Sequence, residues 1–104
     1  MIDVRDFNEV SGGTIPAANW NHLPLGEIGE ALQLDAKSFE LIYEIKKPSE
    51  DQKVIFYCMK GRRSDMAGRL WEQSTGSQNI HHYPGGWKEW NDEWTQGKID
   101  KFSF

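Results

Sequence analysis

The stretch Val54–Ser64 reads VIFYCMKGRRS and contains the features that decide the fold. Its first four residues form a continuous β-branched and aromatic run, which is typical of a strand buried on both faces of a parallel sheet. The run stops at Cys58, and a turn containing glycine leads into a segment with helical spacing of apolar residues. We therefore predict that Cys58 lies where a central strand ends and a helix follows.

The rest of the chain alternates between strand-like and helix-like segments, which favours an α/β fold with a parallel sheet. Around the central strand at 54–57, shorter strands are predicted at 2–4, 17–23 and 79–83. Loop-forming residues cover 8–16.

Three helices are predicted from apolar residues that recur at helical spacing. The first follows Asp35, the second follows the cysteine loop, and the third follows the turn at 84–86. Their inward stripes are predicted to be Phe39, Ile42 and Tyr43; Ala67, Leu70 and Trp71; and Trp87, Trp90 and Trp94.

Composition and charge limit the classes of protein to consider. A chain of 104 residues fits one small domain, and 38% hydrophobic residues with five tryptophans indicate a folded core. The net charge of -4 gives no general attraction to nucleic acid or to an acidic membrane surface. Any site for an anion must therefore be local.

The chain contains a single cysteine, so no internal disulfide can form, and it suits a reducing compartment. No apolar run approaches the roughly 20 residues that a membrane helix needs, and the start shows no targeting signal. We expect a cytoplasmic protein, or a mitochondrial one if a targeting segment is missing from the start.

The surroundings of Cys58 favour a reactive thiolate. Backbone N–H groups of the loop and of the first turn of the next helix are free to point at one atom, and the helix dipole adds positive potential. Lys60, Arg62 and Arg63 place three positive charges within five residues of the sulfur. Such surroundings lower the pKa of a thiol, so we expect Cys58 to be a nucleophile rather than a buried core residue.

The spacing of the loop also separates two kinds of cysteine chemistry. A cysteine phosphatase needs five residues between nucleophile and arginine, so that the loop encloses a tetrahedral phosphate, and Ser64 occupies that position here. Only four residues separate Cys58 from Arg63, which makes a tighter cradle suited to one additional sulfur atom. The sequence therefore favours sulfur transfer over phosphoester hydrolysis.

Two adjacent histidines, His81 and His82, fall in the strand predicted at 79–83. Neighbouring strand residues point to opposite faces, so at most one of them could reach the sulfur, and we expect surface or edge positions for both. No spacing of His, Cys and Asp indicates a metal site, and no cofactor is expected.

The segment Cys58–Ser64 resembles the active-site loop of the single-domain rhodaneses, C-x-x-G-x-R-S. Three further stretches resemble family motifs in the same order: the first-strand signature at Asp3–Arg5, the segment Gly13–Ala18 and the closing motif at Tyr83–Trp87. Within this family the chain is similar to the thiosulfate sulfurtransferases, including the thiosulfate:glutathione type.

The resemblance implies a rhodanese-like α/β fold in which helices flank both faces of a small parallel sheet. It implies a single domain over residues 1–104 that lacks the helix and strand usually found before the first-strand signature, so one sheet edge is bare or covered differently. Residues 95–104 are expected to form a C-terminal tail.

The resemblance also implies a two-step sulfur transfer through Cys58. The thiolate attacks the outer sulfur of thiosulfate and sulfite leaves; a thiol such as glutathione, or cyanide, then removes the sulfur from the resulting persulfide. The backbone N–H groups from Met59 to Ser64, including that of Gly61, are implied to hold the persulfide.

The cationic side chains of the loop have implied roles as well. Arg63 is expected to brace the loop or to meet the anion, and Lys60 and Arg62 to attract the sulfonate group. Such a loop suits doubly charged thiosulfate better than mercaptopyruvate.

Two alternatives stay open. One is a protein-binding module of rhodanese fold; such modules often lack the cysteine, whereas this chain retains it with the full loop. The other is a persulfide relay to a protein sulfur acceptor, which would use the same loop and which sequence alone does not separate from transfer to a small molecule.

Overall fold

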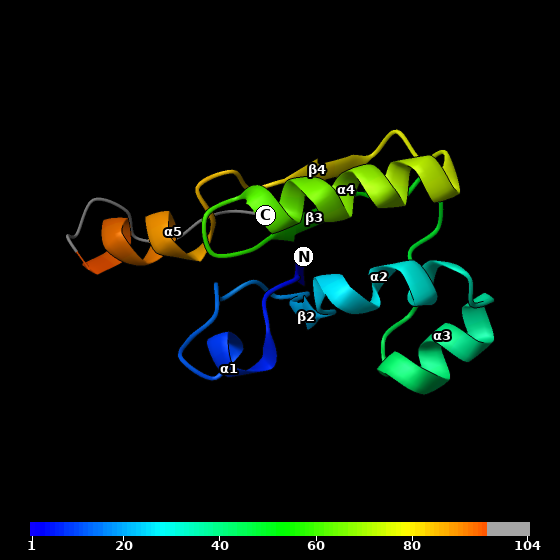
Figure 1. Cartoon of the computed structure of the whole chain (residues 1–104), viewed down its shortest axis with the longest axis horizontal. Helices are drawn as coiled ribbons and strands as arrows, with labels where there is room; N and C mark the ends of the chain where they lie inside the picture. Colours follow the sequence, from blue (N-terminus) through cyan, green and yellow to red (C-terminus); the bar gives the residue numbers. More distant parts are fainter. Residues whose placement is uncertain (96–104) are drawn as a thin grey trace.

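The computed structural model describes residues 1–95 of the chain (Figure 1). The strands in this part are β1 (Ile2–Asp3), β2 (Asn21–His22), β3 (Val54–Tyr57) and β4 (Ile80–His82). The helices are α1 (Phe7–Val10), α2 (Leu25–Leu32), α3 (Ala36–Tyr43), α4 (Arg62–Thr75) and α5 (Gly86–Thr95). Apart from Thr95, the tail predicted at 95–104 lies outside the described residues. No helix in the described part is long and apolar enough to cross a membrane.

The four strands form one parallel sheet in the order β2-β1-β3-β4. Phe56 of β3 pairs with Ile2 of β1 on one side and with His82 of β4 on the other. The predicted parallel sheet and the interior position of β3 are both confirmed. Because β3 is central, the residue after it emerges between two neighbouring strands, where open α/β sheets place their sites.

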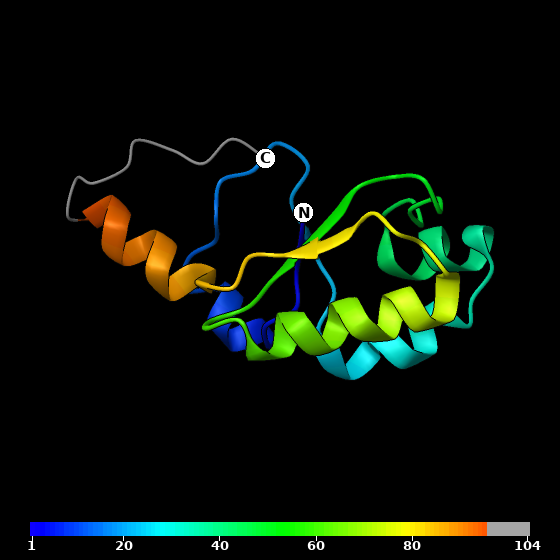
Figure 2. The same cartoon turned by 90° about the horizontal axis from the view of Figure 1, so that it is seen from above.

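Side chains alternate across β3 and divide the core between the two faces of the sheet. Val54 and Phe56 join the larger cluster, which α2, α3 and α4 complete, while Tyr57 packs with Ile15 and with Trp90 of α5 in a smaller one. In Figure 2, α2 and α4 run side by side along the strands, and α5 lies at the end of the molecule where β3 and β4 finish. Helices α2, α3 and α4 thus cover one face, and α5 packs at the carboxyl end of the other, so helices flank both faces as predicted.

Two helices depart from the sequence prediction. Residues 8–16, predicted as a loop, include most of α1, which begins after Asp6. The backbone N–H of Asp6 donates to Glu9 Oε1 at 3.1 Å, which is half of a capping box. Helix α2 was not predicted, because Gly26 and Gly29 interrupt its apolar pattern.

The buried stripes of two helices are narrower than predicted. Ile42 of α3 is 59% exposed and Leu70 of α4 is 41% exposed, although both were predicted to face inward. Phe39 and Trp71 are buried and meet edge to face, with ring centroids 6.3 Å apart. Each helix therefore packs through one narrow line of side chains, and its flanking apolar residues meet solvent.

Asp3 and Arg5, at the end of the first strand, form a buried ion pair. Arg5 Nη2 donates to Asp3 Oδ2 at 2.8 Å and to the carbonyl of Gly13 at 2.7 Å, and both charged side chains are fully buried. The guanidinium also lies over the rings of Tyr57 and Trp87. This pair holds the 5–13 segment and the start of α5 together near the carboxyl ends of the strands.

Candidate active site

Cys58 follows β3 directly, and the loop after it folds back onto its own sulfur. The backbone N–H groups of Gly61 and Ser64 point at Cys58 Sγ, at N···S distances of 3.0 Å and 3.4 Å. The Ser64 hydroxyl lies 3.6 Å from the same sulfur. Cys58 is only 1% exposed. The start of α4 and the loop before it therefore make a cradle of hydrogen-bond donors around a single sulfur atom.

Gly61 is the residue that allows this loop to close. It precedes α4 with φ +97°, a conformation that side-chain-bearing residues rarely adopt. A Cβ atom here would also collide with the carbonyl of Pro84. The glycine of the C-x-x-G pattern is therefore required both by its own backbone angle and by the closing motif that lies against it.

The closing motif fastens the loop from the other side. The backbone N–H of Trp87 donates to the carbonyl of Cys58 at 2.8 Å, and that of Lys88 donates to the carbonyl of Met59 at 3.1 Å. Gly86, with φ +64°, has no room for a Cβ beside these same two carbonyls. The first N–H groups of α5 thus hold the backbone on which the sulfur cradle is built.

Burial is the largest single influence on the thiol of Cys58 and raises its pKa. Hydrogen bonds from the hydroxyl and amide of Ser64, and from the amides of Gly61 and Lys60, act in the opposite direction because they favour the thiolate. Together they outweigh burial, so the pKa of Cys58 is lowered. The lowered pKa that we predicted is confirmed, although hydrogen-bond donors rather than side-chain cations lead the effect.

The cationic residues of the loop divide into two groups. Lys60 and Arg62 are exposed, whereas Arg63 is partly buried and bonded to Glu9 of α1. Arg63 Nη1 and Nη2 donate to the two carboxylate oxygens of Glu9 at 2.6 Å and 2.9 Å. Arg63 therefore ties the start of α4 to α1, and Lys60 and Arg62 are the cations that the loop presents to solvent.

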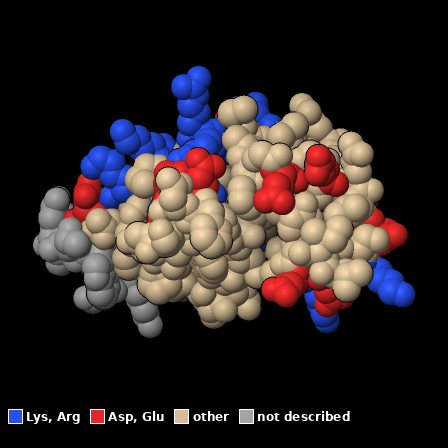
Figure 3. Space-filling model, turned by 60° about the horizontal axis from the view of Figure 1, so that its bottom comes forward, with Lys and Arg blue, Asp and Glu red and all other residues tan. Residues whose placement is uncertain are grey.

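The face drawn in Figure 3 shows where charge gathers. Most of its Lys and Arg side chains lie on one half of the molecule, the half that Figure 1 shows to hold α5 and the loop after β3. The Asp and Glu side chains are scattered over both halves. An acidic protein thus carries a local concentration of positive charge on the half that contains Cys58.

Two residues near the sulfur cradle were not predicted to take part. Glu9 is 54 residues from Arg63, and its acidic side chain in a segment predicted as loop gave no signal. His82, expected at the surface or an edge, lies with Nδ1 3.1 Å from the Ser64 hydroxyl. The only signal for His82 was the alternation of side chains along a strand, which allowed one of the two histidines to point towards the sulfur of Cys58.

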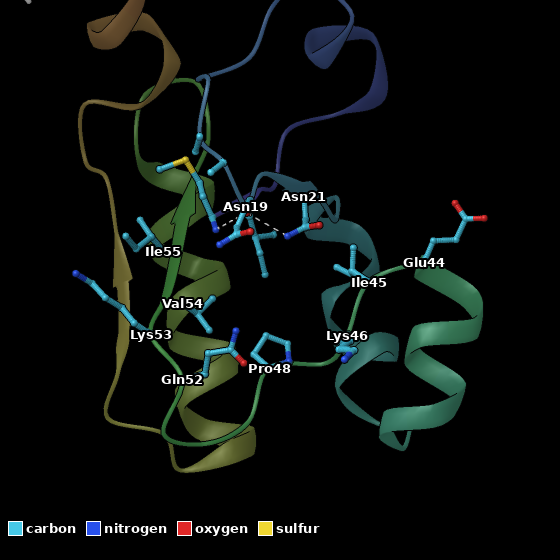
Figure 4. Close-up of a pocket in the computed structure, with 14 residues that line it drawn as sticks. Asn19, Asn21, Glu44, Ile45, Lys46, Pro48, Gln52, Lys53, Val54 and Ile55 are labelled. Atoms are coloured by element: carbon cyan, nitrogen blue, oxygen red, sulfur yellow. Dashed lines mark hydrogen bonds between the residues drawn. The ribbon is translucent and has the colours of Figure 1, made fainter. Parts of the chain in front are cut away.

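A separate hollow of about 550 Å³ lies at the other end of β3 (Figure 4). Val54 and Ile55 line one side, and the segment from Glu44 to Pro48 lines the other. None of the residues 58–64 borders it, and its lining includes neither a cysteine nor a histidine. This hollow is therefore separate from the loop after β3.

Comparison with known proteins shows which family the chain belongs to. Residues 1–93 match the Rhodanese-like domain family. A human protein named thiosulfate:glutathione sulfurtransferase is 35% identical over 91 residues, which cover 86% of this chain and 76% of the human one. A mitochondrial thiosulfate sulfurtransferase of Saccharomyces cerevisiae, RDL2, is 34% identical over 86% of this chain and 58% of its own length.

The fold is matched by a solved structure of the human single-domain sulfurtransferase TSTD1, with a TM-score of 0.80 and 30% identity over 88% of this chain and 80% of that one. The chain belongs to the rhodanese-like domain family. It spans between 56% and 79% of the length of the curated relatives that it matches.

Proposed function

We propose that this chain is a thiosulfate sulfurtransferase in which Cys58 carries the transferred sulfur as a persulfide. The observation that carries the proposal is the cradle around Cys58 Sγ, in which the N–H groups of Gly61 and Ser64 and the Ser64 hydroxyl converge on one atom. These donors stabilise a sulfur anion without offering the wider enclosure that a phosphate needs.

In the first step, the Cys58 thiolate attacks the outer sulfur of thiosulfate. A new S–S bond forms to Cys58, the bond between the outer sulfur and the sulfonate breaks, and sulfite leaves with the bonding electron pair. The exposed cations Lys60 and Arg62 attract the dianion and its sulfonate group. The position of Arg63 on Glu9 supports the loop-bracing role rather than contact with the anion.

In the second step, an acceptor thiolate or cyanide attacks the outer sulfur of the persulfide. The S–S bond to Cys58 breaks, and its electron pair returns to Cys58 as the thiolate that the cradle stabilises. We infer that a small thiol such as glutathione is the acceptor, because relatives of this chain bear the name thiosulfate:glutathione sulfurtransferase. A protein acceptor remains the alternative for the same step.

A reducing compartment follows from the same chemistry, since Cys58 must be a free thiol before each cycle. Some relatives are mitochondrial by name. We propose the cytoplasm for this chain, with the mitochondrial interior as the alternative.

The test is release of sulfite from thiosulfate in the presence of glutathione or cyanide, with wild type and Cys58→Ser compared. We expect turnover by wild type and none above background by the variant. A folded wild-type protein that releases no sulfite with either acceptor would favour a protein-binding module instead. Saturation by a protein persulfide acceptor at far lower concentration than by glutathione would favour the relay.

A further inference from the structure

Cys58 is buried, and its thiol must lose a proton before it can attack. One chain of polar atoms leads from its sulfur to the surface. Cys58 Sγ lies 3.6 Å from the Ser64 hydroxyl oxygen, which lies 3.1 Å from Nδ1 of His82. Cys58 is 1% exposed and Ser64 is fully buried, whereas the side chain of His82 is 29% exposed. Ser64 thus links a buried thiol to a histidine that meets solvent.

The register of the sheet determines which histidine takes this place. His82 pairs with Phe56 of β3, two residues before Cys58, and its side chain lies on the face of the sheet that α4 covers. Its neighbour His81 is exposed and alternates to the opposite direction. His81 therefore offers a matched control for substitutions of His82, because it lies one residue away on the same strand but points away from the cysteine loop.

The Ser64 hydroxyl has one hydrogen and three neighbours that can accept it. They are Cys58 Sγ at 3.6 Å, the carbonyl of Gly61 at 3.1 Å and Nδ1 of His82 at 3.1 Å. When Nδ1 carries no proton, it competes with the sulfur for this hydrogen. When Nδ1 is protonated, it donates to the Ser64 oxygen, and the Ser64 hydrogen is then available to the sulfur.

We propose that His82 is a positioning residue that controls the thiolate of Cys58 through Ser64. The thiol hydrogen passes to the Ser64 oxygen while the Ser64 hydrogen passes to Nδ1 of His82, which leaves a thiolate and an imidazolium joined by one hydroxyl. No atom or charge is gained or lost overall. In the product state, Nδ1–H holds Ser64 so that its hydroxyl donates to the sulfur.

The charged groups around His82 suit this role. Asp65 Oδ1 lies 3.9 Å from Nε2 and favours a proton on that nitrogen, which leaves Nδ1 to exchange with Ser64. Asp65 is shared with Arg69, whose Nε donates to it at 3.0 Å. A surface hollow lined by these residues, Glu72 and both histidines gives His82 access to water.

The test is the pH profile of Cys58 alkylation by iodoacetamide, a neutral reagent that reports the thiolate directly. In His82→Gln we expect the apparent pKa of Cys58 to rise by about one unit, so that alkylation slows about tenfold below the wild-type pKa. His81→Gln is the matched control and should keep the wild-type profile. In a Ser64→Ala background, His82→Gln should cause no further shift.

A His82→Gln profile that superimposes on that of wild type would overturn the proposal, and so would a shift of equal size in the Ser64→Ala background. If His82→Gln is unfolded by circular dichroism, His82→Asn serves as the second variant. The proposal rests on Cys58 as the nucleophile of the proposed function. Alkylation needs no sulfur donor. The role proposed for His82 can therefore fail this test while sulfur transfer through Cys58 still holds, and the two failures are distinguishable.

Discussion

At the scale of single residues, Gly61 shows how one backbone angle sets the chemistry. Its φ of +97° turns the chain so that its own N–H and that of Ser64 both reach Cys58 Sγ. Its missing side chain lets the Pro84 carbonyl lie against the loop. A side chain at this position would have to move either the sulfur cradle or the closing motif.

Gly61→Ala should therefore disable the site while leaving most of the fold in place. We expect sulfur transfer from thiosulfate to fall about 100-fold, because a displacement of about 1 Å in the cradle separates the donors from the sulfur. Steady-state sulfite release, with folding checked by circular dichroism, measures this.

Gly76→Ala is the matched control for backbone strain. Gly76 ends α4 with φ +72°, and a Cβ there meets nothing within 4 Å. We expect this variant to lose about 1 kcal/mol of stability and to keep its activity. Equal activity in the two variants would show that close packing against Pro84 does not shape the site.

The residues of the cradle were predictable from the sequence because they lie within seven consecutive positions. The relative positions of the cradle residues are fixed locally, by the end of a strand, the cysteine, the glycine and the start of the next helix. Glu9 and His82 were not predictable, because they reach the loop only through the tertiary fold, from 54 and 18 residues away. Sequence patterns identify such partners only when the pairing of elements is already known.

At the scale of secondary structure elements, α1 supports the loop through Glu9. The hydrogen bond from Arg63 is the main cause that lowers the pKa of Glu9 from 4.5 to about 2. Since the folded-state pKa lies below the unfolded value, the ion pair stabilises the protein fully above about pH 4.5. That contribution is lost as the pH falls towards 2.

Glu9→Gln should reveal this dependence in urea unfolding. At pH 7 we expect the variant to be about 1 kcal/mol less stable than wild type, since the bidentate pair is only partly shielded from water. The difference should shrink as the pH is lowered below 4.5. Exposed Glu40, changed to Gln, is the control. A stability difference that stays constant from pH 7 to pH 3 would contradict the assignment to this ion pair.

The strongly patterned elements and the short strands were predicted, whereas helices α1 and α2 were not. Strand β3 and helix α4 carry continuous or periodic apolar residues, which the sequence displays directly. Helix α1 spans four residues with none buried, and α2 carries two glycines, so neither gives a clear period. Tertiary packing against α4, rather than helix propensity, stabilises α2.

At the scale of the whole molecule, the net charge and the local charge oppose each other. The chain carries -4 overall and should repel thiosulfate, whereas the loop presents Lys60 and Arg62 to solvent. Local charges dominate at short range because salt screens interactions beyond about 8 Å at physiological ionic strength.

The salt dependence of kcat/KM for thiosulfate shows whether attraction by Lys60 and Arg62 or repulsion by the net charge prevails. We expect kcat/KM to fall several-fold as ionic strength rises, and the fall to disappear when Lys60 and Arg62 are both changed to Ala. Lys37→Ala, on α3 at the opposite end of the molecule (Figure 1), should behave as wild type. A rise of kcat/KM with added salt would mean that the net charge governs the encounter.

The central claim is that Cys58 carries the transferred sulfur, and intact-protein mass spectrometry tests it most directly. After incubation with thiosulfate, wild type should gain the mass of one sulfur atom and lose it when glutathione or cyanide is added. Cys58→Ala should gain nothing. A folded wild-type protein with a reduced thiol that shows no gain, or a Cys58→Ala variant that gains the same mass, would contradict the claim.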